Sequence, residues 1–284
     1  PVLWGGRYPA PPDNDSQGFA FKLGDSMKRT TGLILFAVLP IIPTWGDETD
    51  TNPLIEAAKA YRERDWNGVL EHLEPLLKEP ASNQANDLAR EYAAGALHRR
   101  GEDHFRAARI KESVADFDRE IELLPANDPA HWQRGISYYY AGLYEKGARQ
   151  FERHQTVNPE DVENAVWHFL CVVRSPGGSI AKARSSFIPI QDDTRVPMKQ
   201  VHDLFAGKGS VDAVFSATEG EGPAANFYAN LYVGLYLEAE GKSAESLQYI
   251  TRAAGEPKTR ENYMADVARV HQKLREKEKS APAP

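Results

Sequence analysis

The chain has 284 residues, of which 41% are apolar and 26% are charged, and this composition is typical of one or two globular domains. A formal net charge of −7 and a pI near 5.7 argue against a nucleic-acid-binding protein, which normally carries a basic face. The single cysteine, Cys171, excludes an internal disulfide, so the fold has to rest on its hydrophobic core.

Residues 1–26 precede the first methionine, Met27, and include the stretch PPDNDSQG. Such a composition is typical of loops, because it offers little apolar surface to offset the entropy lost on ordering. We therefore expect residues 1–26 to be a disordered upstream extension.

Residues 27–46 have the three parts of a secretory signal peptide. Lys28 and Arg29 form a basic start, and Gly32 to Pro43 form a short apolar segment. Thr44 and Gly46 then supply small residues at the two positions that a signal peptidase reads. This pattern predicts export to the periplasm or the medium; a leader that stays uncleaved would instead anchor the protein in a membrane. Because no cysteine follows the expected cleavage position, we expect no lipid anchor.

Residues 52–277 show helical periodicity and an internal repeat. The stretch RGEDHFRAARIKESVADFDREIELLP starts at Arg100, and RGISYYYAGLYEKGARQFERHQTVNP starts 34 residues later at Arg134. Four positions match in kind, and they are Arg100 and Arg134, Gly101 and Gly135, Phe117 and Phe151, and Pro125 and Pro159.

Each match has a physical reason in a pair of antiparallel helices. A glycine such as Gly101 or Gly135 lets the second helix approach the first, and Gly142 suits the turn between them. Phe151 fills the packing layer, and Pro159 ends the second helix because proline lacks an amide hydrogen. The spacing resembles the tetratricopeptide family. It implies an all-α fold class, an α–α superhelix or solenoid of stacked helical hairpins over 52–277, with a disordered tail at 278–284.

Weaker copies flank these two repeats. Upstream, we expect a helix pair with Trp66 behind its turn and Leu73 in the packing layer. Downstream, one copy contains Trp167 and Cys171, and another contains Gly234 and Ile250. Between these last two copies we expect a shorter helix pair that turns at the sequence GKGS, then a linker at 218–224. A final helix over 261–277 is expected to act as a cap.

Motifs for catalysis are largely missing, since the sequence has no HExxH, paired CxxC, GxSxG or complete phosphate loop. Ser179 and Lys182 match the short S-x-x-K pattern, but we expect Ser179, like Ser210, to cap a helix. The nearest histidines, His98 and His104, do not share a helix face, so we expect no metal and no cofactor. The open alternative is an enzyme, or an enzyme accessory, with a site in the irregular region 175–223.

A binding surface is the remaining candidate, because the first helices of stacked pairs line a concave groove. Aromatic side chains with a few charges suit an extended peptide or a partner helix. In this phase Tyr138 points into the repeat core, and for Trp132 and Tyr139 packing against an adjacent helix is the alternative. The residues expected to face the groove are Trp132, Ile136, Tyr139, Tyr140, His98, Phe105, Arg106, His168 and Tyr228.

The runs HWQRGISYYYAGLYEKGARQF and ANFYANLYVGLYLEAEGKSAESLQYI resemble the NlpI-type tetratricopeptide proteins of the bacterial envelope. The resemblance covers roughly 87–254, and this chain lacks the lipobox cysteine of that family. It implies a non-catalytic adaptor that presents protein partners, such as cell-wall hydrolases and a processing protease, to each other, often as a homodimer. We therefore expect an exported scaffold that binds proteins or peptides and not nucleic acid.

Overall fold

The computed structural model describes residues 52–78, 84–256 and 262–280. The chain divides into two compact units, one up to Gly95 and one from Ala96 onward, with the boundary inside a single helix. Every regular element in the described ranges is a helix, which confirms the all-α fold class of stacked helical hairpins. The expected extension at 1–26 and the expected signal peptide at 27–46 lie outside the described residues.

The first unit contains α1 (Pro53–Arg62), α2 (Trp66–Lys78) and the beginning of α3 (Gln84–Arg106). Asn52 caps α1 by accepting the Leu54 amide hydrogen at 3.0 Å, next to a proline at the first helical position. Trp66 lies behind the turn, with its ring 5.2 Å from that of Tyr61, and Leu73 is fully buried. These residues form the expected upstream hairpin.

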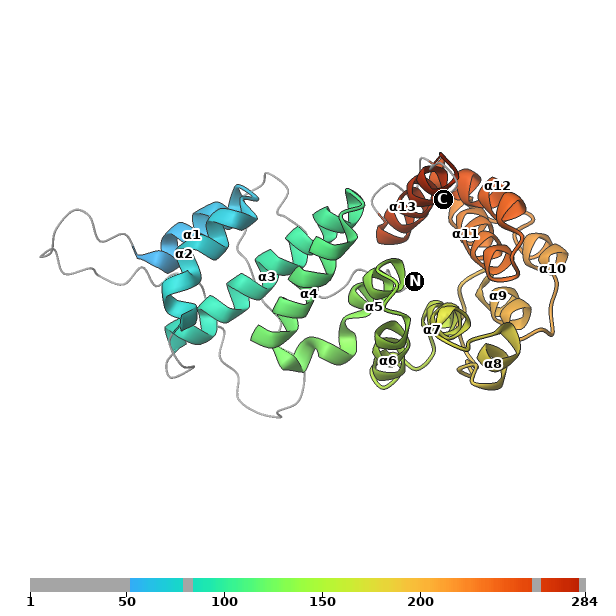
Figure 1. The fold of residues 1–284 in the computed structure, drawn as a ribbon, viewed down its shortest axis with the longest axis horizontal. Helices are drawn as coiled ribbons and strands as arrows, with labels where there is room; N and C mark the ends of the chain where they lie inside the picture. The colour runs from blue at the N-terminus through green and yellow to red at the C-terminus, as the bar shows by residue number, and fades with distance from the viewer. Residues whose placement is uncertain (1–51, 79–83, 257–261, 281–284) are drawn as a thin grey trace, which may run out of the picture. The chain divides into compact units, whose positions relative to one another are not determined.

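The second unit continues the chain of helices, and consecutive helices pack in pairs, α5 with α6, α6 with α7, and α11 with α12 (Figure 1). After α3 its elements are α4 (Ile110–Leu123), η1 (Pro125–Ala130), α5 (Trp132–Tyr140), α6 (Tyr144–His154), α7 (Val162–Arg174), α8 (Ile180–Ser185), α9 (Met198–Phe205), α10 (Val211–Ser216), α11 (Pro223–Ala239), α12 (Ser243–Ala254) and α13 (Tyr263–Ser280).

Helix pairs in this unit meet at a glycine. A Cβ on Gly135 would lie 2.7 Å from the Phe151 ring, and one on Gly101 would lie 2.5 Å from the Phe117 ring. The same spacing of sixteen positions recurs from Gly234 to Ile250, where the distance is 2.7 Å. The glycines therefore set the closeness of the two helices, as the repeat predicts, and the large side chain that fills the space comes from the second helix of the same pair.

The turns inside the pairs need a left-handed residue. Gly142 and Gly241 supply it with φ of 74° and 80°. Ala108 stands 34 positions before Gly142 and adopts a φ of 62°, although its Cβ makes this conformation costly. The first repeat of the matched pair thus keeps the backbone of the second without its glycine.

The region 175–223 is folded into short helices. Ser179 accepts the Lys182 amide hydrogen at 3.1 Å, and Ser210 accepts that of Ala213 at 3.1 Å, so both serines cap helices as predicted. Gly207, with φ of 76°, makes the turn before α10.

Arg195 ties the loop before α9 to the start of α7. Its guanidinium lies 2.7 Å from Asp161, 2.6 Å from Glu163 and 2.6 Å from Asp193. Burial by itself lowers the pKa of Arg195, but the hydrogen bond to Asp193 and the three carboxylate charges raise it. Arg195 and the three carboxylates therefore form a structural ion-pair cluster.

The last helix differs from the expected cap at 261–277. It runs from Tyr263 to Ser280, so the first three residues of the expected tail are helical. Figure 1 shows it next to α12, against which it packs. All five residues from Met264 to Ala268 are buried, which means that this part of α13 is enclosed on every side. None of the helices described is both long and apolar enough to cross a membrane.

Candidate protein-binding face

Five of the residues expected to line a groove contact the region of α13, and we call them the aromatic face. They come from three helices, α3, α5 and α11, and are Phe105, Arg106, Trp132, Tyr140 and Tyr228. Within the described part of the second unit, α13 and the residue before it, Asn262, contact this face. These side chains therefore contact a segment of their own chain, whereas we expected an open groove.

At one end of the face, three rings from three helices meet. The ring of Tyr263, the first residue of α13, stacks on Phe105 with centroids 5.3 Å apart. It is perpendicular to the ring of Trp132, with centroids 5.1 Å apart. Such aromatic pairs each contribute about 0.5–1.5 kcal/mol beyond the burial of their area. The start of α13 is thus held by an aromatic cluster.

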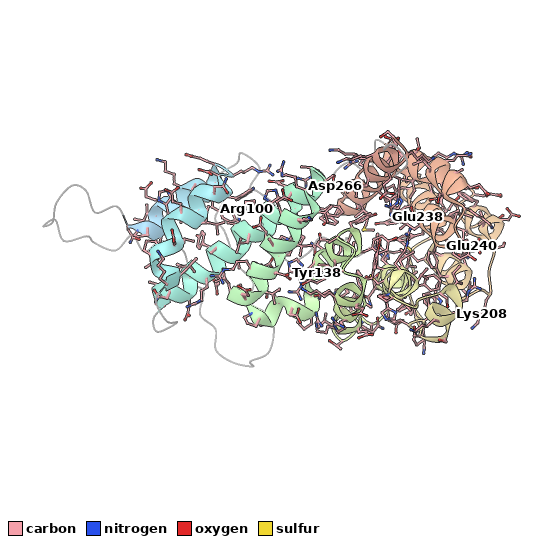
Figure 2. The ribbon with its side chains drawn as sticks, in the orientation of Figure 1. Arg100, Tyr138, Lys208, Glu238, Glu240 and Asp266 are labelled. Atoms are coloured by element: carbon pink, nitrogen blue, oxygen red, sulfur yellow. The ribbon has the colours of Figure 1, made fainter. Side chains whose placement is uncertain are left out.

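Polar contacts surround that cluster. The guanidinium of Arg106 lies 3.1 Å from the Asp266 carboxylate of α13. The amide of Asn262 donates to the Tyr228 hydroxyl at 3.0 Å, and the Lys273 ammonium donates to the Ala107 carbonyl oxygen at 3.3 Å. Asp266 is labelled in Figure 2. Arg106 is 48% exposed, so its ion pair adds orientation more than stability.

Tyr140 marks the middle of the face. Its hydroxyl lies 3.0 Å from Nδ1 of His271, and its ring packs beside Tyr139 and Trp167 at 5.2 and 6.1 Å. Burial raises the pKa of Tyr140 well above its ordinary value, so its hydroxyl keeps its proton. Of the three tyrosines in a row, Tyr140 is therefore the one that contacts α13 through a hydrogen bond.

Glu238 on α11 holds the other half of α13, and Figure 2 labels it. Its carboxylate accepts hydrogen bonds from His271 at 2.8 Å and from Arg275 at 2.8 and 2.9 Å. Arg174 of α7 adds a further one at 2.6 Å. Burial by itself raises the pKa of Glu238, but the hydrogen bonds from His271 and Arg275 hold it well below its usual range. Glu238 is therefore a buried charge whose partners come largely from α13.

Two further predicted residues lie inside the helix pairs. Ile136 is fully buried, and Tyr139 is 3% exposed and packs edge-on against Trp167 at 5.4 Å. Tyr139 therefore packs against an adjacent helix, which was the alternative to a place in the groove. Tyr138 is buried as predicted, and its hydroxyl donates to Asp118.

The two predicted histidines do not reach the aromatic face. His168 is 4% exposed, and its Nε2 lies 3.4 Å from Glu152 of α6. His98 is 2% exposed, and its Nδ1 lies 3.0 Å from Glu120 of α4. The repeat phase places both on the first helix of a pair, but both side chains are buried and contact a carboxylate on a neighbouring helix. The expectation that they face an open groove is wrong for the structure as described.

His98, Glu120 and His131 form a cluster whose candidate ligand atoms lie within 4.8 Å of one another, a spacing that would suit a metal ion. Nδ1 of His131 accepts the Arg134 amide hydrogen at 3.3 Å, so Nε2 carries the hydrogen that Glu120 receives at 2.7 Å. Metal binding would need a lone pair at that Nε2.

The contacts of His98 also favour a hydrogen-bonded network over a metal site. Its Nε2 lies 3.4 Å from Glu102, opposite the bond to Glu120. Burial by itself lowers the pKa of His98, but the hydrogen bonds to Glu102 and Glu120 raise it to about 9. The cluster is therefore a hydrogen-bonded ionic network in which both rings already use the nitrogens that face Glu120.

Cys171 and Ser179 have structural surroundings. Cys171 is fully buried, and burial raises the pKa of its thiol. A Cβ on Gly147 would lie 2.7 Å from its sulfur, so the thiol packs at a close helix crossing. The Ser179 hydroxyl is used as a helix cap.

The sequence analysis did not single out Glu238 or the α13 residues that contact the face, which include Tyr263, Asp266, His271 and Arg275. One signal was present for Glu238, since it is the first charged residue after a long, uncharged and largely apolar run in YANLYVGLYLE. Comparison with known protein families and with characterised proteins finds no match to this chain.

Proposed function

We propose that the protein is a non-catalytic adaptor that binds other proteins through its aromatic face. The observation that carries the proposal is that this face already receives a helix, α13, through stacked rings and a buried carboxylate. Grooves that bind helical peptides use the same combination of aromatic anchors and a few placed charges.

The proposal includes the family and the compartment. We place the chain among tetratricopeptide adaptors of the NlpI type, exported after cleavage near Gly46 and able to form homodimers. The motifs at 100–159 and the leader pattern at 27–46 support this. Mass spectrometry of the mature N-terminus, after expression with the leader in a Gram-negative host, tests it. A mature chain that still carries residues 27–46 would contradict export by cleavage.

The binding face can be tested with α13 itself as the probe. We would replace residues 257–261 by a protease site, cut the purified full chain, and add a fluorescent peptide of residues 262–280. If the face binds helices, the peptide replaces the cut segment, and its anisotropy rises to saturation. Tyr140→Ala should weaken the binding, whereas Val157→Ala, at an exposed position, should not.

A second arm asks whether proteins use the same face. Partners captured from an envelope extract by the cut chain should be displaced by an excess of the same peptide. Partners that remain bound with the peptide at saturation would show that binding occurs elsewhere, and would contradict the proposed role of the aromatic face.

A further inference from the structure

We infer that a partner enters as a helix that replaces α13, and that it is selected by charge: a basic pair four residues apart for Glu238 and an acidic residue nearer its N-terminus for Arg106. This rests on the proposed function and deepens it, because it states which chemistry the occupant needs.

The charged contacts of α13 lie at the two ends of its apolar part. Asp266 reaches Arg106 on α3, and His271 and Arg275 reach Glu238 on α11. His271 and Arg275 are four residues apart, so they share one side of the helix. An occupant in the same orientation must repeat this order, an acidic residue first and the two donors to Glu238 later.

Of the two charged residues on the face, Glu238 has the larger effect on which helix can bind. Its side chain is 6% exposed, and without α13 its ion-pair partner among the described residues is Arg174, whose side chain is 37% exposed. A buried carboxylate that loses most of its donors is costly, because the lost hydrogen bonds are not replaced by bulk water. A purely apolar helix would leave Glu238 in this state, so the face discriminates against it.

Arg106 contributes orientation. It is half exposed and also pairs with Asp103 at 2.6 Å on its own helix, so it tolerates the loss of Asp266. We therefore expect the acidic residue of the partner to matter less for affinity than its basic pair.

The test is competition on the cut chain described above. Unlabelled peptides of residues 262–280 displace the fluorescent one, and three are compared: the parent, Arg275→Gln and Lys277→Gln. Both variants remove one positive charge from the same helix, but Lys277 is exposed, so it is the matched control. We expect Arg275→Gln to compete at least about tenfold more weakly than the parent, and Lys277→Gln to stay within about twofold.

The outcomes separate the two proposals. Equal competition by the parent and Arg275→Gln would overturn charge selection and leave helix binding intact. Failure of the parent peptide to compete at all would overturn both. A concentration-dependent dimer of the uncut chain that disappears on addition of the peptide would show that the occupant is α13 of a second copy, and would overturn the assignment to a partner protein.

A reciprocal variant does not depend on the peptide alone. In a Glu238→Gln chain the parent and Arg275→Gln peptides should compete within about twofold of each other, because the neutral amide forms no charge-assisted hydrogen bond with Arg275. Continued tenfold discrimination by that chain would show that Arg275 acts through another residue.

Discussion

The closeness of the paired helices predicts that alanine at Gly135 destabilises the protein. The added Cβ would lie 2.7 Å from Cζ and 3.0 Å from Cε1 and Cε2 of Phe151, whereas carbon atoms prefer about 3.5–4.0 Å. Phe151 is 1% exposed, so its ring has no free space to enter. Overpacking of this kind costs about 1–3 kcal/mol, and the better helix propensity of alanine returns about 1 kcal/mol. With three ring atoms affected, we expect a net loss of about 2 kcal/mol.

Urea denaturation followed by circular dichroism measures this loss. Gly95→Ala is the matched control, because its nearest neighbour is the Tyr61 hydroxyl at 3.2 Å, the end of a partly exposed side chain. That variant should be neutral or more stable by up to about 1 kcal/mol. In a Phe151→Leu background, which removes the ring atoms, Gly135→Ala should cost about 1 kcal/mol less. A Gly135→Ala protein as stable as the wild type would refute the reasoning.

Two further predictions concern stability. Ala108→Gly should stabilise the protein by about 0.5–1 kcal/mol and Gly142→Ala should destabilise it by about 1–2 kcal/mol, since both positions have a φ above 60°. In urea denaturation the two variants should change the free energy of unfolding in opposite directions, and a change in the same direction would contradict this reasoning. The raised pKa of His98, about 9 against 6.5, stabilises the fold below pH 6.5, and this contribution is lost as the pH rises through 9. The free energy of unfolding should therefore fall by about 3 kcal/mol more in the wild type than in His98→Gln between about pH 6 and about pH 10, and equal slopes would contradict the ionic network.

The helix pairs could be predicted because their signals are local. Gly101 and Gly135 stand at a fixed distance from Phe117 and Phe151, and one hairpin brings each pair together. The caps at Ser179 and Ser210 depend on residues three positions away. When two residues in contact are this close in sequence, their spacing is enough to predict the contact.

The occupant of the aromatic face could not be predicted, because its contacts are long-range. Tyr140 and His271 are 131 residues apart, and the periodicity of α5 shows which side faces inward without showing what returns to cover it. His98 illustrates the same limit. Its helical phase pointed to the groove, but Glu120, 22 residues away, determines where the ring lies.

The presence of α13 on the aromatic face is the central claim, and nuclear Overhauser effects between aromatic rings test it most directly. In a chain with selectively protonated aromatic residues, Tyr263 should show cross-peaks to Trp132 and Phe105, whose ring centroids lie 5.1 and 5.3 Å away. The cross-peak between Tyr139 and Trp167, at 5.4 Å, serves as the internal reference for the repeat. If the reference appears and Tyr263 shows neither contact, α13 does not lie on the face, and the account is contradicted.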